Sequence, residues 1–201
     1  MTAETAITAY INKFVPLTDE EATLFYAAFK EMRIKKRAFV IQPGFPVPSR
    51  YYVLKGCLRA FAVTEDGTEH TISFAIEDWW ITDYNSYLYQ QNATMFVAAL
   101  EDCIVLRLDF ATEQELKASN PKFERFFRII AERGLAYQQR RVISNLTLSA
   151  EKRYAQFLER YSAIAQRVPQ YTLASFLGIT TEYLSKLRNN KVSTKVRPKK
   201  T

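Results

Sequence analysis

The spacing of hydrophobic residues predicts two helices near the N-terminus. Four apolar residues between Ile7 and Phe14 recur every three to four positions and would share one helix face. The same spacing returns from Leu24 to Phe29, after Thr18 and a run of acidic residues. Threonine followed by acids is typical of a helix N-terminus, because the threonine hydroxyl caps free backbone N–H groups.

From Ile34 to about Leu108 the pattern changes to short β-rich runs separated by turn residues. Asp66 and Gly67 are a strong hairpin signal, since this pair favours a tight turn between strands. The flanking runs, residues 57–63 and 70–75, are therefore predicted to pair with each other.

A second hairpin is predicted where Glu101 and Asp102 separate the apolar runs 96–100 and 103–108. Short strands at such spacing are typical of a β-sandwich or jelly roll. We therefore expect a β jelly roll within an α+β fold.

Beyond Asp109 helical spacing returns. Residues from Glu113 to about Leu146 are predicted to be helical, with Pro121 near a helix start and an apolar stripe along one face. Such a segment can bury one face against the β unit and offer another to a second copy of the chain. An ordinary core helix is the alternative. A further helix is predicted from Ala150 to about Ala165.

A short apolar helix, a glycine and a second helix follow one another between residues 170 and 188. Gly178 can supply the positive φ that ends the first helix and turns the chain. Thr180 can cap the second helix with its hydroxyl. The positions that match the helix-turn-helix pattern are Ala174, Gly178, Leu184 and Leu187.

Polar side chains of the second helix point away from its leucines and can meet base edges and phosphates in a major groove. The predicted DNA-contacting residues are Thr180, Thr181, Glu182, Ser185, Lys186, Arg188, Asn189 and Lys191. Any helical hairpin with a glycine turn shows a similar spacing, so a second observation is needed.

That second observation is the charge distribution. The chain holds 28 Lys and Arg against 21 Asp and Glu, a net charge of +7. No acidic residue follows Glu182, and all of the excess positive charge lies after it. A basic block that begins on the second helix indicates a polyanionic partner and favours double-stranded DNA.

Four stretches carry a family resemblance: residues 51–59 (YYVLKGCLR), 65–74 (EDGTEHTISF), 77–80 (EDWW) and 177–188 (LGITTEYLSKLR). With a jelly roll, a long helix and a C-terminal helix-turn-helix, the chain resembles the Crp/Fnr family of transcription regulators. It looks closest to a branch common in Bacteroidetes-type bacteria. The resemblance implies a homodimer paired through the long helix and reading a two-fold-symmetric operator, with RNA polymerase as a further candidate partner.

Two departures from the family pattern affect what this chain is expected to bind. Thr181 stands where the recognition helix usually has arginine, so a different operator sequence is expected, because a hydroxyl cannot contact guanine in bidentate fashion. Members that bind cyclic AMP carry Gly-Glu and then Arg-Ser/Thr-Ala in a phosphate cassette. The matching stretches here are Thr82-Asp83 and Ala93-Thr94-Met95, with alanine at the arginine position.

Loss of a buried phosphate partner costs about 2–5 kcal/mol, so the cassette is not expected to bind a cyclic nucleotide. Aromatic residues nearby either line an apolar pocket for an unknown small-molecule effector or pack in the core. The candidate pocket residues are Trp80, Asp83, Tyr84, Thr94 and Phe96.

Other chemistries find little support. Cys57 and Cys103 are too few for an iron–sulfur cluster held by one chain, and His70 alone cannot supply the metal ligands of a cupin-type enzyme. We therefore predict no enzymatic activity, no catalytic residue, no cofactor and no metal. The remaining alternative is a ligand-binding or interaction module whose helix-turn-helix no longer binds DNA.

The predicted organisation has three parts. Residues 1–110 form a cyclic nucleotide-binding-like sensor domain with N-terminal helices, and residues 111–147 form a connecting and dimerisation helix. Residues 148–201 form a helix-turn-helix DNA-binding domain with a basic tail. Neither a secretory signal nor an apolar run of membrane-spanning length is visible, so we expect a cytoplasmic protein with no membrane partner.

Overall fold

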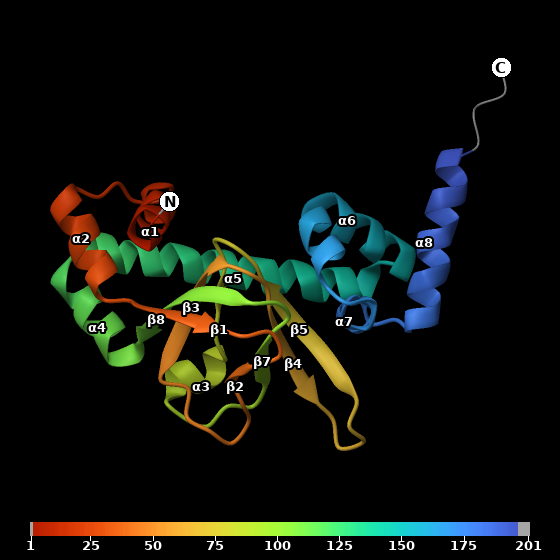
Figure 1. Ribbon diagram of the computed structural model, residues 1–201, viewed down its shortest axis with the longest axis horizontal. Helices are drawn as coiled ribbons and strands as arrows, with labels where there is room; N and C mark the ends of the chain where they lie inside the picture. The colour runs from red at the N-terminus through yellow and green to blue at the C-terminus, as the bar shows by residue number, and fades with distance from the viewer. Residues whose placement is uncertain (1, 197–201) are drawn as a thin grey trace.

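The computed structural model describes residues 2–196, with side chains placed for residues 2–189. A β roll lies beside one long helix, α5, which runs towards a group of helices near the C-terminus (Figure 1). The strands are β1 (Lys30–Ile34), β2 (Phe39–Ile41), β3 (Ser49–Lys55), β4 (Leu58–Val63), β5 (Glu69–Ala75), β6 (Trp80–Ile81), β7 (Phe96–Ala99) and β8 (Cys103–Asp109). The helices are α1 (Ala3–Asn12), α2 (Asp19–Ala27), α3 (Tyr84–Tyr89), α4 (Phe110–Ser119), α5 (Pro121–Thr147), α6 (Ala150–Arg167), α7 (Gln170–Leu177) and α8 (Thr181–Val196).

The strands form two antiparallel four-stranded sheets, in the orders β1-β8-β3-β6 and β2-β7-β4-β5. Their inner faces share one core, in which Val53, Leu58, Val97 and Val105 are fully buried. This arrangement confirms the α+β class and the jelly-roll-like β unit that the strand spacing predicts.

One predicted hairpin is confirmed and the other is wrong. β4 and β5 pair around Asp66 and Gly67, and Gly67 has a φ of +82°. β7 and β8 lie in different sheets, because β7 pairs with β2 and β4 whereas β8 pairs with β1 and β3. Glu101 and Asp102 therefore connect the two sheets. A turn signal alone cannot distinguish a hairpin from such a crossover, since both strands bury one face in the same core.

The predicted N-terminal helices are confirmed as α1 and α2. Thr18 and Glu21 form a capping box: the Thr18 hydroxyl accepts from the Glu21 N–H, and the Glu21 carboxylate accepts from the Thr18 N–H at 2.9 Å. Ile7, Ile11 and Phe25 of these helices pack fully buried in one cluster with aromatic residues of α5. The N-terminal helices thereby hold the first half of α5 against the β roll.

The segment predicted as helical from Glu113 to about Leu146 consists of two helices. Asn120 breaks the helical path with φ −154° and ψ 123°, and its side chain accepts from the Lys122 N–H at 2.9 Å. Pro121 is the first residue of α5. The break follows because proline pushes the preceding residue into extended backbone and cannot donate to the previous turn.

Candidate nucleic-acid interface and sensor region

The turn between α7 and α8 has the backbone conformation that the sequence predicts. Gly178 lies in the left-handed region with φ +65° and ψ 41°, and backbone N–H bonds to Ala174 and Ser175 end α7 there. A side chain at this position would be strained because L-residues disfavour this φ. Thr180 then caps α8, with its hydroxyl accepting from the Tyr183 N–H at 3.2 Å.

An apolar face on each helix holds this pair together. Leu173 and Leu184 are fully buried, and Ala174 is 2% exposed at the crossing. These residues pack in one cluster with Tyr154 and Phe157 of α6. The small side chain at residue 174 lets the two helices approach, as the sequence pattern predicts.

The predicted DNA-contacting residues gather along α8. Thr181, Glu182, Lys186 and Asn189 are exposed, while Ser185 and Arg188 are partly exposed. The Lys191 side chain, like the basic residues after it, lies outside the described side chains. A hydrogen bond from its own backbone N–H, and a second from the Thr180 side chain, lower the pKa of the exposed Glu182 carboxylate.

Two contacts at α8 escaped the sequence analysis. Gln170 at the start of α7 donates through its amide to the Ser185 hydroxyl, so Ser185 also holds α7 against α8. Tyr183 donates its hydroxyl to the carboxylate of Glu151 on α6. Both contacts join separate helices, and no local sequence signal marks them.

The helix-turn-helix is docked on the β roll through β5. The Ser175 hydroxyl donates to the Glu69 carbonyl at 2.8 Å and accepts from the Thr71 N–H at 2.8 Å. The Arg141 guanidinium of α5 donates to the carbonyls of Thr71 and Ile72. Strand β5 is therefore bonded both to the first helix of the motif and to the long helix.

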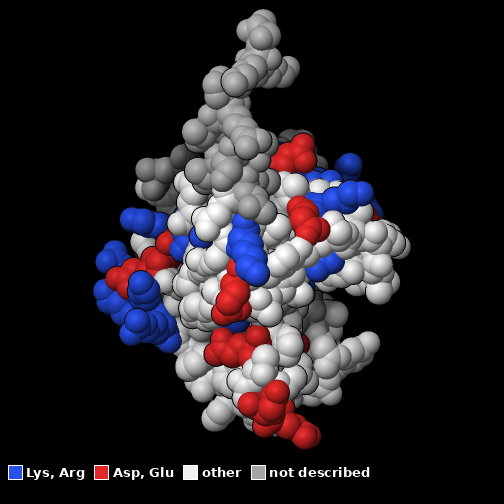
Figure 2. All heavy atoms as spheres, turned by 90° about the vertical axis from the view of Figure 1, so that its right-hand side faces the viewer, with Lys and Arg blue, Asp and Glu red and all other residues white. Residues whose placement is uncertain are grey.

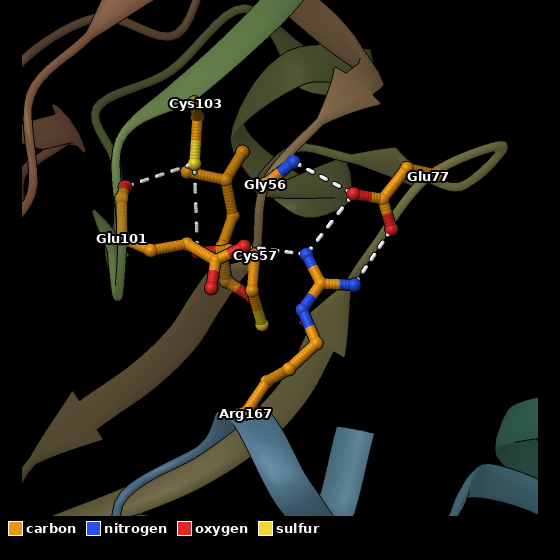
Figure 3. A network of polar contacts seen from close by, with 7 residues as sticks. Gly56, Cys57, Glu77, Glu101, Cys103 and Arg167 are labelled. Atoms are coloured by element: carbon orange, nitrogen blue, oxygen red, sulfur yellow. Dashed lines mark hydrogen bonds and ion pairs between the residues drawn. The ribbon is translucent and has the colours of Figure 1, made fainter. Parts of the chain in front are cut away.

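A second junction lies at the end of α6 (Figure 3). Arg167 donates to both carboxylate oxygens of Glu77, at 2.7 and 3.0 Å, and also bonds Glu101. The Gly56 N–H donates to Glu77 at 2.8 Å. Burial alone would raise the pKa of Glu77, but the hydrogen bonds from Arg167 and Gly56 lower it to about 2. This Arg167 junction is a charged link between the β roll and the C-terminal helices.

The cassette positions Asp83 and Thr94 meet, but they bond to each other. One Asp83 oxygen accepts from the Thr94 N–H at 2.8 Å and from its hydroxyl at 3.0 Å. The other oxygen caps α3, a short helix that the sequence analysis did not predict, through the Ser86 N–H. Burial raises the pKa of Asp83, yet these hydrogen bonds from Thr94 and Ser86 give a net lowering. The carboxylate therefore holds the loop closed.

The aromatic residues of the candidate pocket lie apart. Trp80 packs against Tyr52 and Phe127 in the cluster beneath the N-terminal helices. Phe96 stacks on Phe61 with ring centroids 5.1 Å apart. Tyr84 is 41% exposed. The structure brings only Asp83 and Thr94 of the five candidate residues into direct contact.

An arginine does lie near the cassette, but it comes from β3. Arg50 is 4% exposed and donates to the Glu113 carboxylate at 2.6 Å. Tyr87 of α3 donates to the same carboxylate at 2.8 Å, and Lys117 pairs with it at 2.6 Å. Arg50 stands 63 residues from its partner in sequence, so inspection of the cassette alone misses it.

The two cysteines and the histidine lie in different surroundings. Cys57 and Cys103 are buried free thiols, and burial raises the pKa of Cys57 to about 12. His70 is exposed on β5. Among the described residues, no group of three or more His, Cys, Asp or Glu side chains could hold a metal ion. No described helix combines the length and apolarity needed to cross a membrane.

Known proteins share both the sequence pattern and the fold. The family profile described as "Cyclic nucleotide-binding domain" matches residues 31–120. The anaerobic regulatory protein of Pasteurella multocida is 24% identical over 165 residues, which cover 77% of this chain and 60% of that protein. A transcriptional regulator of the Crp/Fnr family from Thermus thermophilus has a TM-score of 0.65 at 21% identity, covering 82% of this chain and 87% of that one.

Residues 31–120 carry a cyclic nucleotide-binding domain, and the chain is similar to regulators of the Crp/Fnr family in sequence and in fold. The c-di-GMP-responsive global regulator CLP of Xanthomonas campestris shows the same fold, with a TM-score of 0.71 at 16% identity, covering 92% of this chain and 96% of that one. The chain spans about 60% of the length of the Pasteurella relative. Membership of the Bacteroidetes-type branch of the Crp/Fnr family stays a prediction.

Proposed function

We propose that this chain is a DNA-binding transcriptional regulator that acts in the cytoplasm as a homodimer. The observation that carries the proposal is the exposed polar face of α8. This helix is the second of a pair that packs through a buried apolar face and is joined by the turn at Gly178. Thr181, Glu182 and Lys186 project from its first turns into solvent. Recognition helices read base edges with residues of their N-terminal part, which is where these side chains lie.

The side-chain chemistry supports major-groove readout. The Glu182 carboxylate can accept from the amino group of cytosine, and Lys186 can donate to guanine or to a phosphate. The Thr181 hydroxyl can donate to an acceptor or accept from a donor on a base edge, so it discriminates less between bases. Figure 2, viewed from the α8 end, shows basic side chains on both flanks and in the centre of this side, with acidic ones among them and at its lower end. The acidic lower end would lie away from the phosphates of bound DNA.

Dimerisation is supported by the second half of α5. Leu135, Val142 and Leu146 are 72%, 56% and 81% exposed in the single chain. They stand seven and then four residues apart, so they share one stripe of the helix. A stripe of exposed large apolar side chains marks an interface, and a second copy of the same helix matches it. To read an inverted repeat, the proposed dimer must present its two copies of α8 one DNA turn apart.

The docking contacts support a regulated mechanism. Through Ser175 and Arg167 the helix-turn-helix is bonded to β5 and to Glu77 of the β roll. A change in the β roll can therefore shift the population of α8 orientations and so the affinity for the operator. The Asp83 carboxylate already accepts a hydrogen bond from Thr94, and this supports the expectation that the cassette does not bind a cyclic nucleotide. Any effector would then be a different molecule. RNA polymerase is a further proposed partner.

Selection from random duplex DNA, without ligand and with cyclic AMP, tests this function. We expect enrichment of one inverted repeat in both arms. On that duplex, Lys186→Ala should weaken binding and lower the slope of log affinity against log salt by about one. Lys36→Ala, which removes an exposed lysine of the β roll, should leave both quantities unchanged.

Two results would contradict the proposal. Enrichment only with cyclic AMP would restore the cassette as a nucleotide site despite Ala93. No enrichment in either arm, together with unchanged salt dependence in Lys186→Ala, would favour an interaction module whose helix-turn-helix no longer binds DNA.

A further inference from the structure

A cleft lies where the second half of α5 meets α6 and α7. Its lining includes four arginines, Arg140 and Arg141 from α5 and Arg153 and Arg160 from α6, and no acidic residue among the described residues. We call it the arginine cleft. Its inner volume is about 80 Å³ and it opens to solvent on one side. It is separate from the cassette and from the exposed face of α8.

The four arginines fall into two pairs. Arg153 donates to the carbonyls of Leu148 and Leu177, and Arg141 donates to carbonyls of β5. These two hold the walls of the cleft. Arg140 and Arg160 are exposed and make no hydrogen bond or ion pair to another described residue. Two guanidiniums, one on each of two helices, therefore face the cleft with their donors free.

The cleft also concentrates positive charge that the protein does not neutralise. The Arg141 Nε is buried without a hydrogen-bond partner among the described residues. Burial lowers the pKa of Arg141, which reports the cost of holding its charge there. Burial raises the pKa of Tyr137 in the same wall to about 12, so this phenol does not supply a compensating negative charge at neutral pH. An anion in the cleft would relieve this cost.

Size and donor geometry narrow the class of anion. The inner volume of about 80 Å³ accommodates one oxyanion group, so the rest of a larger ligand would lie on the open side of the cleft. A carboxylate has two oxygens and matches one guanidinium fork, whereas a phosphate monoester has enough free oxygens for two forks. We propose that the arginine cleft binds the phosphate group of a phosphorylated small molecule, with the remainder of the ligand on the open side.

Such a ligand would join the long helix to the DNA-binding unit. Only Leu148 and Ser149 separate α5 from α6, and Arg140 and Arg160 lie on opposite sides of this connection. A phosphate held by both arginines would fix the angle between the two helices. It would thereby stabilise one orientation of α7 and α8. Because such coupling is reciprocal, the protein in that orientation would bind the ligand more tightly.

Calorimetric titration of the full chain, without DNA, tests the proposal. The probes are glycerol 3-phosphate and inorganic phosphate, with glycerol as the uncharged control and glycerate as the monocarboxylate. We expect both phosphates to bind, glycerol not to bind, and glycerate, whose single carboxylate matches only one guanidinium fork, to bind at least tenfold more weakly. The double variant R140Q/R160Q should lose at least tenfold in phosphate affinity. Arg128→Gln, which removes a cation paired with Glu132 elsewhere on α5, should stay within twofold.

Tryptophan fluorescence gives a second readout. The Trp79 ring lies 6.2 Å from Tyr137 and 5.6 Å from Tyr161, centroid to centroid, so it lies beside the cleft wall. Glycerol 3-phosphate should change its emission in the wild type but not in R140Q/R160Q. Because both replaced arginines are exposed, the variant should keep the wild-type circular dichroism spectrum.

Three results would overturn the inference. The first is that neither phosphate binds the folded wild type at millimolar concentration. The second is that glycerate binds as tightly as glycerol 3-phosphate, and the third is that R140Q/R160Q binds phosphate with unchanged affinity. If R140Q/R160Q weakens DNA binding while the wild type binds no phosphate, the two arginines contact the DNA backbone instead. That result would leave the proposed regulator function intact.

Discussion

Two arginine–carboxylate clusters use the same chemistry in opposite surroundings. In the first, the side chains of Arg50 and Glu113 are 5% and 0% exposed inside the β roll. In the second, those of Arg167 and Glu77 are 26% and 42% exposed between the β roll and α6. Separating a buried ion pair leaves each charge without a partner and without water. In a half-exposed pair, water can solvate each charge after the two side chains separate. The first cluster is therefore expected to contribute more to the stability of the fold, and the second to separate at a lower cost.

The largest expected effect comes from breaking the buried cluster. Glu113→Gln removes the counter-charge of Arg50 and one acceptor of Tyr87, so we expect the free energy of unfolding to fall by about 3–5 kcal/mol. Urea denaturation measures the change. Glu115→Gln, on the exposed side of the same helix, should change it by no more than about 0.5 kcal/mol.

A double variant sharpens this result. R50L/E113L removes both charges of the buried pair and should be less destabilised than Glu113→Gln, because the Arg50 guanidinium is no longer left unpaired in the core. The Lys117 ammonium also loses its partner, but its side chain is 20% exposed and keeps access to water. Equal destabilisation of the two variants would show that lost packing, rather than the stranded charge, sets the cost.

A smaller effect is expected at the Arg167 junction. Arg167→Gln should lower the free energy of unfolding by only about 1 kcal/mol, because its partners are partly exposed. It should, however, speed amide exchange in α7 and at Thr71 of β5, where the helix-turn-helix is docked. Arg125→Gln, an exposed arginine of α5, is the matched control. Unchanged exchange in Arg167→Gln would mean that the junction does not hold the two parts together.

The smallest expected effect, and the most specific one, is the response of the Arg167 junction to acid. Folding lowers the pKa of Glu77 from 4.5 to about 2, so its stabilising contribution is present above about pH 4.5. This contribution is lost as the pH falls from about 4.5 to 2. The protection factor of the Thr71 amide, which corrects for the pH dependence of intrinsic exchange, should fall in the wild type as the pH falls over that range.

Glu77→Gln provides the control for this acid response. In this variant the protection factor of the Thr71 amide should depend less on pH between 4.5 and 2. At neutral pH this amide should exchange faster than in the wild type. An identical pH profile in both proteins would assign the acid response to another carboxylate.

The local features that the sequence predicted are those in which neighbouring residues decide the backbone. Thr18 with Glu21 caps a helix, Asp66 with Gly67 turns a hairpin, and Gly178 ends α7 at a positive φ. Each depends on a few consecutive side chains and on backbone sterics, so it can be read without the fold.

The candidate site could be predicted only in part. The helical period predicted that α8 has a polar face exposed to solvent and that Leu184 is buried, because the face of a helix is a local property. It could not reveal that Ser185 is held by Gln170 or that Tyr183 bonds Glu151. It also suggested a common pocket for Trp80, Asp83 and Phe96, which pack in different parts of the β roll.

The sequence by itself thus determined the jelly-roll class, the turn at Gly178 and the excess of positive charge after Glu182. Only the tertiary structure decided that β7 and β8 lie in different sheets and that Arg50 meets Glu113. It also brought Arg167 to Glu77, 90 residues away, and Arg140 to the same cleft as Arg160. The physical reason is that local sterics and periodicity act over a few residues. Charge pairing and burial depend on which distant segments the folded core brings together.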